Sequence, residues 1–422
     1  MEKLAINGGE KLIKNEFTPF NTYGPEEERA VLDVLKSGVL SKFLGEWGDD
    51  FFGGPKVREF EKKCEDYFSV KHAVTVNSWT SGLIAAVGAI DIEPGDEVIV
   101  TTMTMCASAT AILHWNAIPV FADIDPETYN ICTQSIEKNI TPYTKAIMVA
   151  DIFGQSADME SIMKIAKKNN LKVISDCAQA PGSLYKNKYS GTLADVGGFS
   201  LNYHKHIHTG EGGILVTDSD KIANKLRLIR NHGEAVIKSK GDNDLINIIG
   251  HNFRLGEIES ALGIEQLKKL DKIIKKRQHI ASRLRSGLKD LHGLNLPKID
   301  VENTHVYYVF PMQIDESITK IHRNKIHAAL SAEGLAVGGV GMLTHLLPIY
   351  QKKIAYGKSG FPWTSSICRR EIDYSKGICP IAEDIHENKI LQLGLCSYDY
   401  SDSEIDLVIK VFHKVWNQLE DL

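Results

Sequence analysis

Five short apolar runs, separated by stretches with helical character, constrain the fold of this chain most strongly. The runs comprise residues 72–76, 97–101, 119–122, 145–149 and 171–175, and the helical stretches comprise residues 81–89, 107–115, 135–139 and 159–168. Strands that alternate with helices in this way predict an α/β fold with a mostly parallel sheet covered by helices on both faces. Ligands of such sheets bind at the carboxyl ends of the strands, so polar residues that follow the strands are the first candidates for chemistry.

The rest of the chain predicts a second, smaller domain of α+β type. Residues 255–291 favour a long helix that bridges two domains, and a strand (306–313) and helices (321–333, 403–419) follow. A chain of 422 residues is too long for one compact core. We therefore expect a large domain over residues 1–265 and a small C-terminal domain over residues 266–422, with residues 350–377 forming an irregular surface insertion.

Composition argues against several classes of partner. The formal net charge is −5 and no lysine/arginine stripe is present, so we expect no nucleic-acid partner. The first residues lack the apolar region of a signal peptide, and the longest apolar stretch, near residues 83–90, is too short to span a membrane. Seven scattered cysteines without a Cys-x-x-Cys pair indicate reduced thiols in the cytoplasm.

Lys205 is the strongest candidate for catalysis. It lies between an apolar run at residues 199–201 and a glycine-rich turn at residues 209–213, with Ser200 five residues before it and Gly210 five residues after it. A lysine held rigid and partly desolvated there loses its proton more readily and can form a Schiff base with a carbonyl group.

Two more polar segments follow predicted strands. Thr80 and Ser81 open a helix after the first strand, where free backbone amides and hydroxyl groups could bind a phosphate. Asp176 follows the fifth strand and faces the ligand crevice, where a carboxylate could pair with a cationic ring nitrogen. For each of these segments a plain helix cap is the alternative interpretation.

In order and spacing, these segments resemble the sugar aminotransferases of the DegT/DnrJ/EryC1/StrS type, which belong to fold type I of the enzymes that use pyridoxal 5′-phosphate (PLP). The resemblance runs from residues 53–55 to residues 379–383, and its most specific part is the lysine segment that ends in Thr-Gly-Glu-Gly-Gly. It implies a large PLP-binding domain, with a mostly parallel sheet flanked by helices, and a smaller α+β C-terminal domain.

The resemblance also implies roles for individual residues. Lys205 would bind the cofactor covalently and then move a proton between the substrate carbon and the cofactor carbon. Asp176 would keep the pyridine nitrogen protonated, and Gln179 would contact the phenolic oxygen of the ring. The residues expected to bind the cofactor phosphate are Thr80, Ser81 and Ser200.

Further residues extend the implied site. Asn252 resembles an asparagine that the family supplies from the neighbouring subunit, which would make the active sites shared within a homodimer. His345 resembles a family histidine near the active site, and His206 is a second candidate for substrate contact. Met105 stands where the family usually places an aromatic residue against the pyridine ring, so a polarizable thioether would have to cover that face.

The alternating His204, His206 and His208 raise two further questions. In a strand they would share one side and form a possible metal cluster, but no cysteine or carboxylate has matching spacing, so we expect no metal. Some relatives replace the lysine with histidine and remove a hydroxyl group. Counting from Ser200 puts Lys205 at the reactive position, which favours transamination over deoxygenation.

The sequence therefore predicts a PLP-dependent aminotransferase that moves an amino group from an amino acid to a keto sugar. The resemblance implies L-glutamate or L-glutamine as donor and a nucleotide-linked sugar in surface polysaccharide or amino-sugar biosynthesis. Three alternatives stay open. The start of the chain, residues 4–9, looks like that of some cyclitol aminotransferases, so the acceptor could be an inosose or another small keto compound. The others are a PLP-dependent sugar 3-dehydratase and a non-catalytic PLP-binding regulator.

Overall fold

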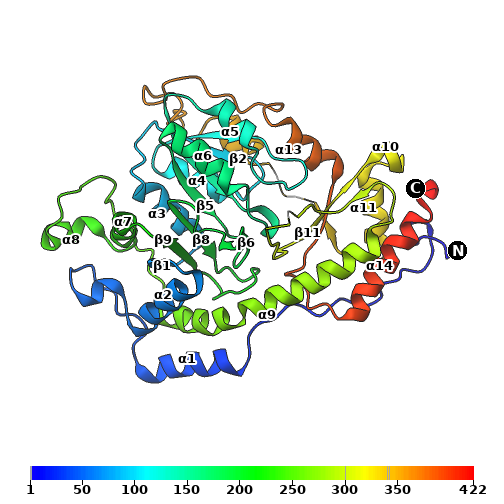
Figure 1. The fold of residues 1–422 in the computed structure, drawn as a ribbon, viewed down its shortest axis with the longest axis horizontal. Helices are drawn as coiled ribbons and strands as arrows, with labels where there is room; N and C mark the ends of the chain where they lie inside the picture. The colour runs from blue at the N-terminus through cyan, green and yellow to red at the C-terminus, as the bar shows by residue number, and fades with distance from the viewer. Residues whose placement is uncertain (1, 300, 340, 342) are drawn as a thin grey trace.

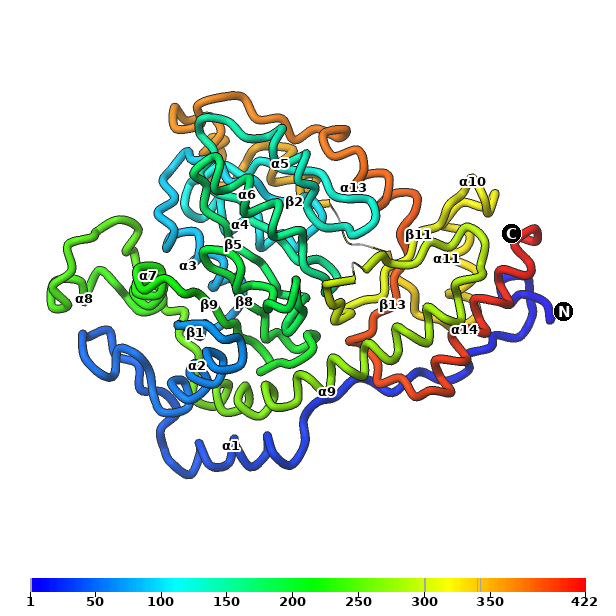
Figure 2. The backbone as a smooth tube through the Cα atoms, in the orientation of Figure 1, coloured from blue at the N-terminus to red at the C-terminus, as the bar shows by residue number. Residues whose placement is uncertain are grey.

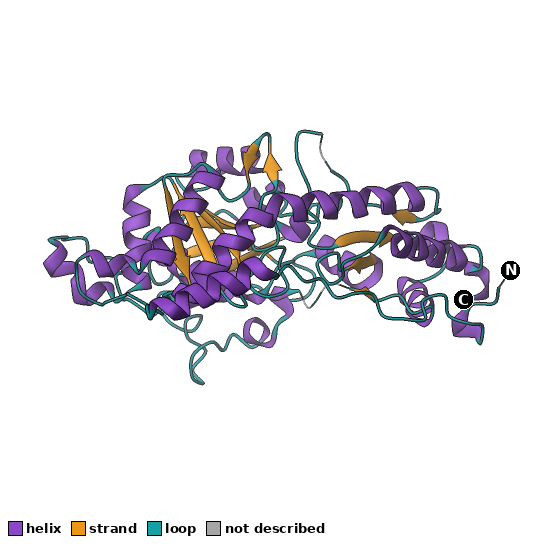
Figure 3. Cartoon of the chain, turned by 90° about the horizontal axis from the view of Figure 1, so that it is seen from below, coloured by secondary structure: helices purple, strands orange, loops and turns teal. Residues whose placement is uncertain are grey.

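The computed structural model of the protein describes residues 2–299, 301–339, 341 and 343–422. A large body built on one sheet lies beside a smaller body, and helix α9 (Glu257–Leu288) runs along both (Figure 1). Viewed from below, the molecule is elongated, with the large sheet near one end and both chain termini near the other (Figure 3). The long helix predicted at residues 255–291 is confirmed, including its bridging position.

The large body is built on a seven-stranded sheet in the order β1-β9-β8-β5-β4-β2-β3. Neighbouring strands are parallel from β8 to β3, whereas β9 runs antiparallel to both β8 and β1. The expected mostly parallel sheet is confirmed. The strands are β1 (His72–Val76), β2 (Glu97–Thr101), β3 (Ile118–Ala122), β4 (Thr144–Ala150), β5 (Lys172–Asp176), β8 (Val196–Ser200) and β9 (Gly213–Thr217).

Helices cover both faces of this sheet, and the side chains of β9 show how. Ile214 and Val216 pack in a cluster with residues of α9, whereas Leu215 points to the opposite face and packs in the cluster that contains α3. The helices of the large body are α1 (Pro25–Ser37), α2 (Pro55–Phe68), α3 (Trp79–Ala89), α4 (Cys106–His114), α5 (Thr133–Asn139), α6 (Met159–Asn169), α7 (Asp220–Arg230) and α8 (Gly233–Lys240).

The smaller body contains a four-stranded antiparallel sheet in the order β10-β11-β13-β12. Phe310, Leu330, Leu393 and Phe412 are fully buried in its core, which confirms an α+β unit with its own apolar cluster. Its elements are β10 (Leu294–Asn295), β11 (Phe310–Ile314), β12 (Val337–Gly338), β13 (Ile390–Leu393), α10 (Glu316–Thr319), α11 (Arg323–Ala332) and α14 (Asp402–Trp416). Short elements elsewhere are β6 (Leu184–Tyr185), β7 (Lys188–Tyr189), α12 (Pro348–Gln351) and α13 (Pro380–Asp384).

Two stretches of chain pack across the expected boundary at residue 265. Leu4, Ile13 and Phe17 belong to the core of the smaller body, and the start of the chain then runs beneath α9 to α1 (Figure 2). Residues 343–385 return in the other direction and contribute to the core of the large body. The division into residues 1–265 and 266–422 stays a prediction. The two apolar cores do not divide at that boundary, because each contains residues from both sides of it.

The expectation of a surface insertion at residues 350–377 is wrong in one respect. Its backbone is irregular, as predicted, but Tyr350 and Tyr374 are buried. Their rings lie 5.0 and 5.5 Å from the Phe121 ring of β3, centroid to centroid. Edge-to-face aromatic contacts therefore anchor this segment on the large body. Within the described ranges, no helix is both long and apolar enough to cross a membrane.

Candidate active site

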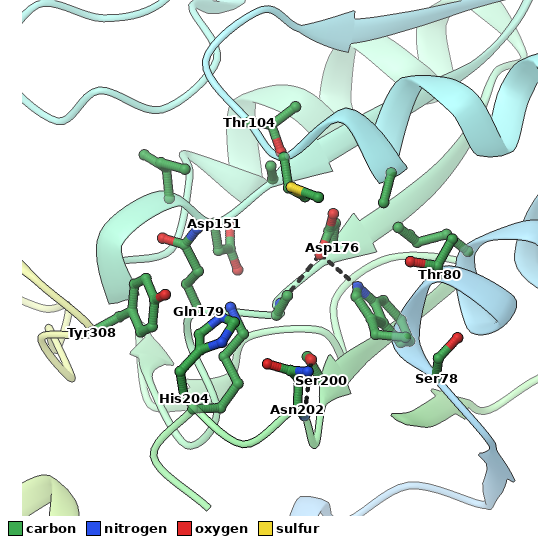
Figure 4. A pocket seen from close by; sticks show the side chains of 18 of the residues that line it. Ser78, Thr80, Thr104, Asp151, Asp176, Gln179, Ser200, Asn202, His204 and Tyr308 are labelled. Carbon is green, nitrogen blue, oxygen red and sulfur yellow. Dashed lines mark hydrogen bonds between the residues drawn. The ribbon is translucent and has the colours of Figure 1, made fainter. Parts of the chain in front are cut away.

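A cavity of about 300 Å³ opens at the carboxyl ends of the parallel strands (Figure 4). Its lining residues lie at or just after the ends of five strands, with one contribution from the segment that leads into β11. They include Ser78, Trp79, Thr80, Thr104, Met105, Asp151, Asp176, Gln179, Ser200, Asn202, His204, Lys205 and Tyr308. The structure thus brings together six of the predicted site residues: Thr80, Met105, Asp176, Gln179, Ser200 and Lys205.

Lys205 lies in a closed loop after β8. The backbone amide of Thr209 donates to the carbonyl of Leu201 at 3.0 Å, and the amide of Lys205 donates to the carbonyl of Asn202 at 3.0 Å. Gly210 has a φ of +84°, a left-handed conformation that favours glycine. These bonds fix the lysine backbone, so the side chain projects into the cavity from a defined position.

The amine of Lys205 lies in an environment that disfavours its charged form. The side chain is only 7% exposed, and its Nζ atom lies 4.4 Å from the centroid of the Tyr308 ring. Burial lowers the pKa of Lys205 to about 8, although the negative charge of Asp176 acts in the opposite direction. The neutral, nucleophilic form of this amine is therefore more populated near physiological pH than it is for an exposed lysine.

Asp176, the last residue of β5, is held by donors on both carboxylate oxygens. The indole Nε1 of Trp79 donates to Oδ1 at 2.6 Å, and the hydroxyl of Ser108 donates to Oδ2 at 2.7 Å. Neither donor is among the predicted site residues. The sequence predicts packing for Trp79, with ligand contact left open by its place at the start of the helix after the first strand, and Ser108 lies inside α4, away from the end of any strand.

Asp151 is a cavity residue that the sequence analysis missed. It is 1% exposed and accepts hydrogen bonds from the amide of Ala157 at 2.9 Å and from the thiol of Cys177 at 3.0 Å. Burial raises the pKa of Asp151 to about 7. A usable signal existed, because Asp151 comes two residues after the end of the fourth predicted strand, close to the position that singled out Asp176 after the fifth.

The end of the cavity next to β1 presents the first turn of α3. Ser78 caps this helix, since its hydroxyl oxygen accepts from the amide of Ser81 at 3.1 Å. The cap interpretation is therefore correct for Ser78, whereas Thr80 lines the cavity and Ser81 does not. Ser200 lies across the cavity and accepts from the amide of Asn202 at 3.3 Å. A helix N-terminus with hydroxyl groups around it favours an anion.

Two other predicted residues border the opposite part of the cavity. The side-chain oxygen of Gln179 accepts from the amide of Phe153 at 2.8 Å, which fixes the orientation of its amide group. Met105 precedes α4 and is 66% exposed, so its side chain lies at the rim of the cavity. Figure 4 shows Gln179, His204 and Tyr308 on one side of Asp176 and Thr80 on the other.

Besides Ser81, three predicted site residues lie outside the cavity lining. The Asn252 side-chain oxygen accepts from Arg254 at 2.7 Å, near the carboxyl end of β1. His206 is fully buried, with Nε2 hydrogen-bonded to the carbonyl of Val306 at 2.8 Å. His345 is fully buried between Thr102 and Glu383, with its ring nitrogens 2.5 and 3.0 Å from their side-chain oxygens.

The three alternating histidines do not form one face, because they lie in a loop of turns instead of a strand. His204 lines the cavity, His206 points toward Val306, and Nδ1 of His208 lies 3.2 Å from the hydroxyl of Tyr23. Across the part of the chain that the structure describes, no group of three candidate ligands could hold a metal ion.

Comparison with known proteins identifies the class of this site. Residues 26–386 match the DegT/DnrJ/EryC1/StrS aminotransferase family. The chain belongs to this family. Its homologues and structural neighbours are PLP-dependent sugar aminotransferases, so the protein is an aminotransferase of this class.

Individual relatives agree with this family assignment. The spore coat polysaccharide biosynthesis protein SpsC of Bacillus subtilis is 35% identical over 370 residues, covering 85% of this chain and 92% of SpsC. The GDP-perosamine synthase of Caulobacter vibrioides is 36% identical over 298 residues, covering 70% of this chain and 79% of that enzyme. The crystal structure of DesI with its TDP-sugar product has a TM-score of 0.82 at 25% identity, covering 99% of this chain and 97% of DesI.

Proposed function

We propose that this aminotransferase uses PLP in the cavity at the strand ends to move an amino group from L-glutamate or L-glutamine to a nucleotide-linked keto sugar. One observation carries the proposal most strongly. A buried lysine with a lowered pKa shares one cavity with a carboxylate that is rigidly held at the end of the neighbouring strand.

The residues of the cavity fit PLP. Lys205 supplies a partly neutral amine, Asp176 supplies a carboxylate, and the first turn of α3 supplies amides for a phosphate. Asp176 has about four acceptor positions and uses three of them, for Trp79, Ser108 and the amide of Ala178. One position is left for the protonated nitrogen of a pyridine ring.

Each residue then has a defined task. When bound, PLP supplies a ring that withdraws electrons from the carbon next to the transferred amine. Lys205 acts as base and acid at Nζ in both half-reactions, because one proton moves in opposite directions in the two halves. Asp176 holds the ring nitrogen and Gln179 the phenolic oxygen. Thr80 and Ser200 bind the phosphate, the role of Ser81 outside the lining stays a prediction, and Met105 covers one face of the ring.

The names of relatives support a sugar acceptor that carries a nucleotide. The chain is similar to GDP-perosamine synthases and to DesI, which was crystallised with a TDP-sugar product. Its similarity to a spore coat polysaccharide biosynthesis protein supports a role in surface polysaccharide or amino-sugar biosynthesis. Lys205 at the cavity favours transamination over 3-dehydration, since a primary amine could leave the cofactor carbon and return to it, whereas an imidazole could not.

We further place the active sites in a cytoplasmic homodimer in which Asn252 reaches the cavity of the partner subunit. Exposed apolar side chains near the cavity and near Asn252 support a covering subunit. Met105, Tyr203 and Ile249 are each about two-thirds exposed. The substrate contacts of His206 and His345 stay predictions, and their burial favours an indirect role.

Two half-reactions test the proposal. Purified protein reconstituted with PLP should lose its visible cofactor absorbance when L-glutamate or L-glutamine is added. A panel of free keto sugars, nucleotide-linked keto sugars and an inosose should then show which acceptor restores that absorbance. Lys205→Ala should show no turnover, whereas a change at the exposed Lys221 should leave turnover intact. Multiple turnover by Lys205→Ala would disprove the proposed role of Lys205. Recovery of the cofactor absorbance with the inosose alone would disprove the proposal that the acceptor is a keto sugar.

A further inference from the structure

The carboxylate of Asp176 is contacted by the side chains of Trp79, which lines the cavity, and of Ser108, which is fully buried. We propose that Trp79 and Ser108 are positioning residues that lock and polarise the Asp176 carboxylate so that it holds the cofactor ring nitrogen in its protonated form. This inference rests on the proposed function, since it concerns the same cofactor site.

Trp79 is held in one place by glycines on three elements. A Cβ atom added to Gly198 of β8 would lie 2.4 Å from Cζ3 of the indole. A Cβ at Gly82 of α3 would lie 2.8 Å from Cε3, and one at Gly213 of β9 would lie 2.9 Å from the Trp79 Cα atom. The indole therefore fills a slot that a side chain larger than glycine at position 198 or 82 would close. Its Nε1–H points from this slot at Asp176.

Ser108 donates directly to the other carboxylate oxygen, and a second hydroxyl group lies behind it. Its proton is directed to Oδ2 of Asp176, so its oxygen is free to accept a hydrogen bond. The hydroxyl of Thr104, which lines the cavity, lies 2.9 Å from it and is the donor. The three groups form an ordered series from Thr104 to Ser108 to Asp176. Ser108 itself is fully buried, so no water competes for its bond.

Two consequences follow from these contacts. Donors on both oxygens prevent rotation of the carboxylate, so its remaining acceptor position keeps a constant direction. Each donor also makes a charge-assisted hydrogen bond to the carboxylate, which is stronger than a bond between neutral groups. The remaining acceptor position would therefore receive a hydrogen bond from a protonated ring nitrogen in one fixed direction.

Binding of PLP to the apoprotein tests this inference without relying on turnover. Trp79→Phe keeps the aromatic packing and removes only the donor, and Ser108→Ala removes the second donor. The control is Trp115→Phe, which removes another buried indole bond, from Nε1 to the carbonyl of Ile84 at 2.7 Å. Equilibrium dialysis should show that Trp79→Phe and Ser108→Ala each weaken PLP binding about tenfold, as for loss of a hydrogen bond to a charged group. Trp115→Phe should bind PLP like the unchanged protein.

A double-variant cycle distinguishes positioning from simple packing. If Trp79 and Ser108 act through the carboxylate, their changes should have little further effect on PLP binding in an Asp176→Ala background. Unchanged binding in both single variants, or equal losses with and without Asp176, would overturn the inference while leaving the proposed function intact. Failure of the unchanged protein to bind PLP would overturn the proposed function and this inference together.

Discussion

The Nζ atom of Lys205 lies 4.4 Å from the centroid of the Tyr308 ring, although the two residues come from different bodies of the molecule. Backbone hydrogen bonds connect Tyr308 to both bodies. Its amide donates to the carbonyl of Phe153, after β4, at 2.9 Å, and its carbonyl accepts from the amide of Cys396, after β13, at 3.3 Å. Tyr308 therefore closes the cavity over the amine and contributes to its burial.

The lowered pKa of Lys205 predicts the pH dependence of cofactor capture. Only the neutral amine attacks the aldehyde of PLP, so the rate should rise with pH and level off above the pKa. We expect a midpoint near pH 8, the value to which burial lowers this group, instead of the ordinary 10.5. Absorbance after mixing apoprotein with PLP at a series of pH values measures the rate. A midpoint near 10.5 would contradict the assigned burial.

Replacement of the Tyr308 ring should shift that midpoint upward. Tyr308→Leu would admit water to Lys205 and stabilise its charged form, whereas Tyr308→Phe keeps the ring and removes only the hydroxyl group. Each unit of upward shift would slow capture about tenfold at neutral pH. The same mixing experiment should give an unchanged midpoint for Tyr308→Phe. A lower midpoint for Tyr308→Leu would mean that attraction between the ring and the ammonium group outweighs desolvation.

The buried ion pair of Arg230 and Glu61 should make a large contribution to stability. Arg230 is fully buried and its Nη1 atom lies 2.5 Å from Oε1 of Glu61, which also accepts two hydrogen bonds from Thr75 at 2.8 Å. Arg230→Met leaves a buried carboxylate without its cation and should lower the free energy of unfolding by about 3–5 kcal/mol. Chemical denaturation measures this loss.

The control for that experiment is the half-exposed Lys172, which pairs with Asp195 at 2.8 Å. Lys172→Met should cost less than about 1 kcal/mol, because solvent screens an exposed pair. Equal losses for the two variants would show that the Arg230 pair gains nothing from its burial.

His345 should act on stability more than on substrate binding. Its imidazole links Thr102, just after β2, to Glu383 of α13, and burial lowers its pKa so that the ring is neutral. His345→Ala removes the partner of both groups and should cost about 1–3 kcal/mol in the free energy of unfolding. The KM for the sugar acceptor should change by less than about threefold. His204→Ala, at the cavity surface, should show the reverse pattern, and a selective rise in KM for His345→Ala would restore its predicted substrate role.

Much of the fold could be predicted from the sequence because it depends on local patterns. Alternating apolar runs and helices predicted the strands from β1 to β5 within one or two residues, since buried parallel strands require continuous apolar side chains. Residues 350–377 were harder to interpret. Their aromatic side chains gave no periodic signal, although Tyr350 and Tyr374 find partners on β3.

The candidate site likewise contains residues that could be predicted from the sequence and residues that could not. Asp176, at a strand end, could be found from position alone, because the carboxyl ends of parallel strands meet at one edge of the sheet, and Lys205 could be found from the glycine-rich turn after it. Trp79 could not be assigned, since only packing against Gly198 aims its indole at Asp176. His206 and His345 had suitable chemistry in the sequence, but the direction of a side chain in a loop depends on its distant neighbours.

By itself the sequence determined which residues follow each strand, the register of Lys205 between Ser200 and Gly210, and hence the class of chemistry. Only the tertiary structure decided that Tyr308 covers the amine of Lys205 and that Trp79 and Ser108 hold Asp176. The physical reason is that desolvation and hydrogen-bond partners arise from contacts between distant segments, and these contacts set the pKa of an amine and the orientation of a carboxylate.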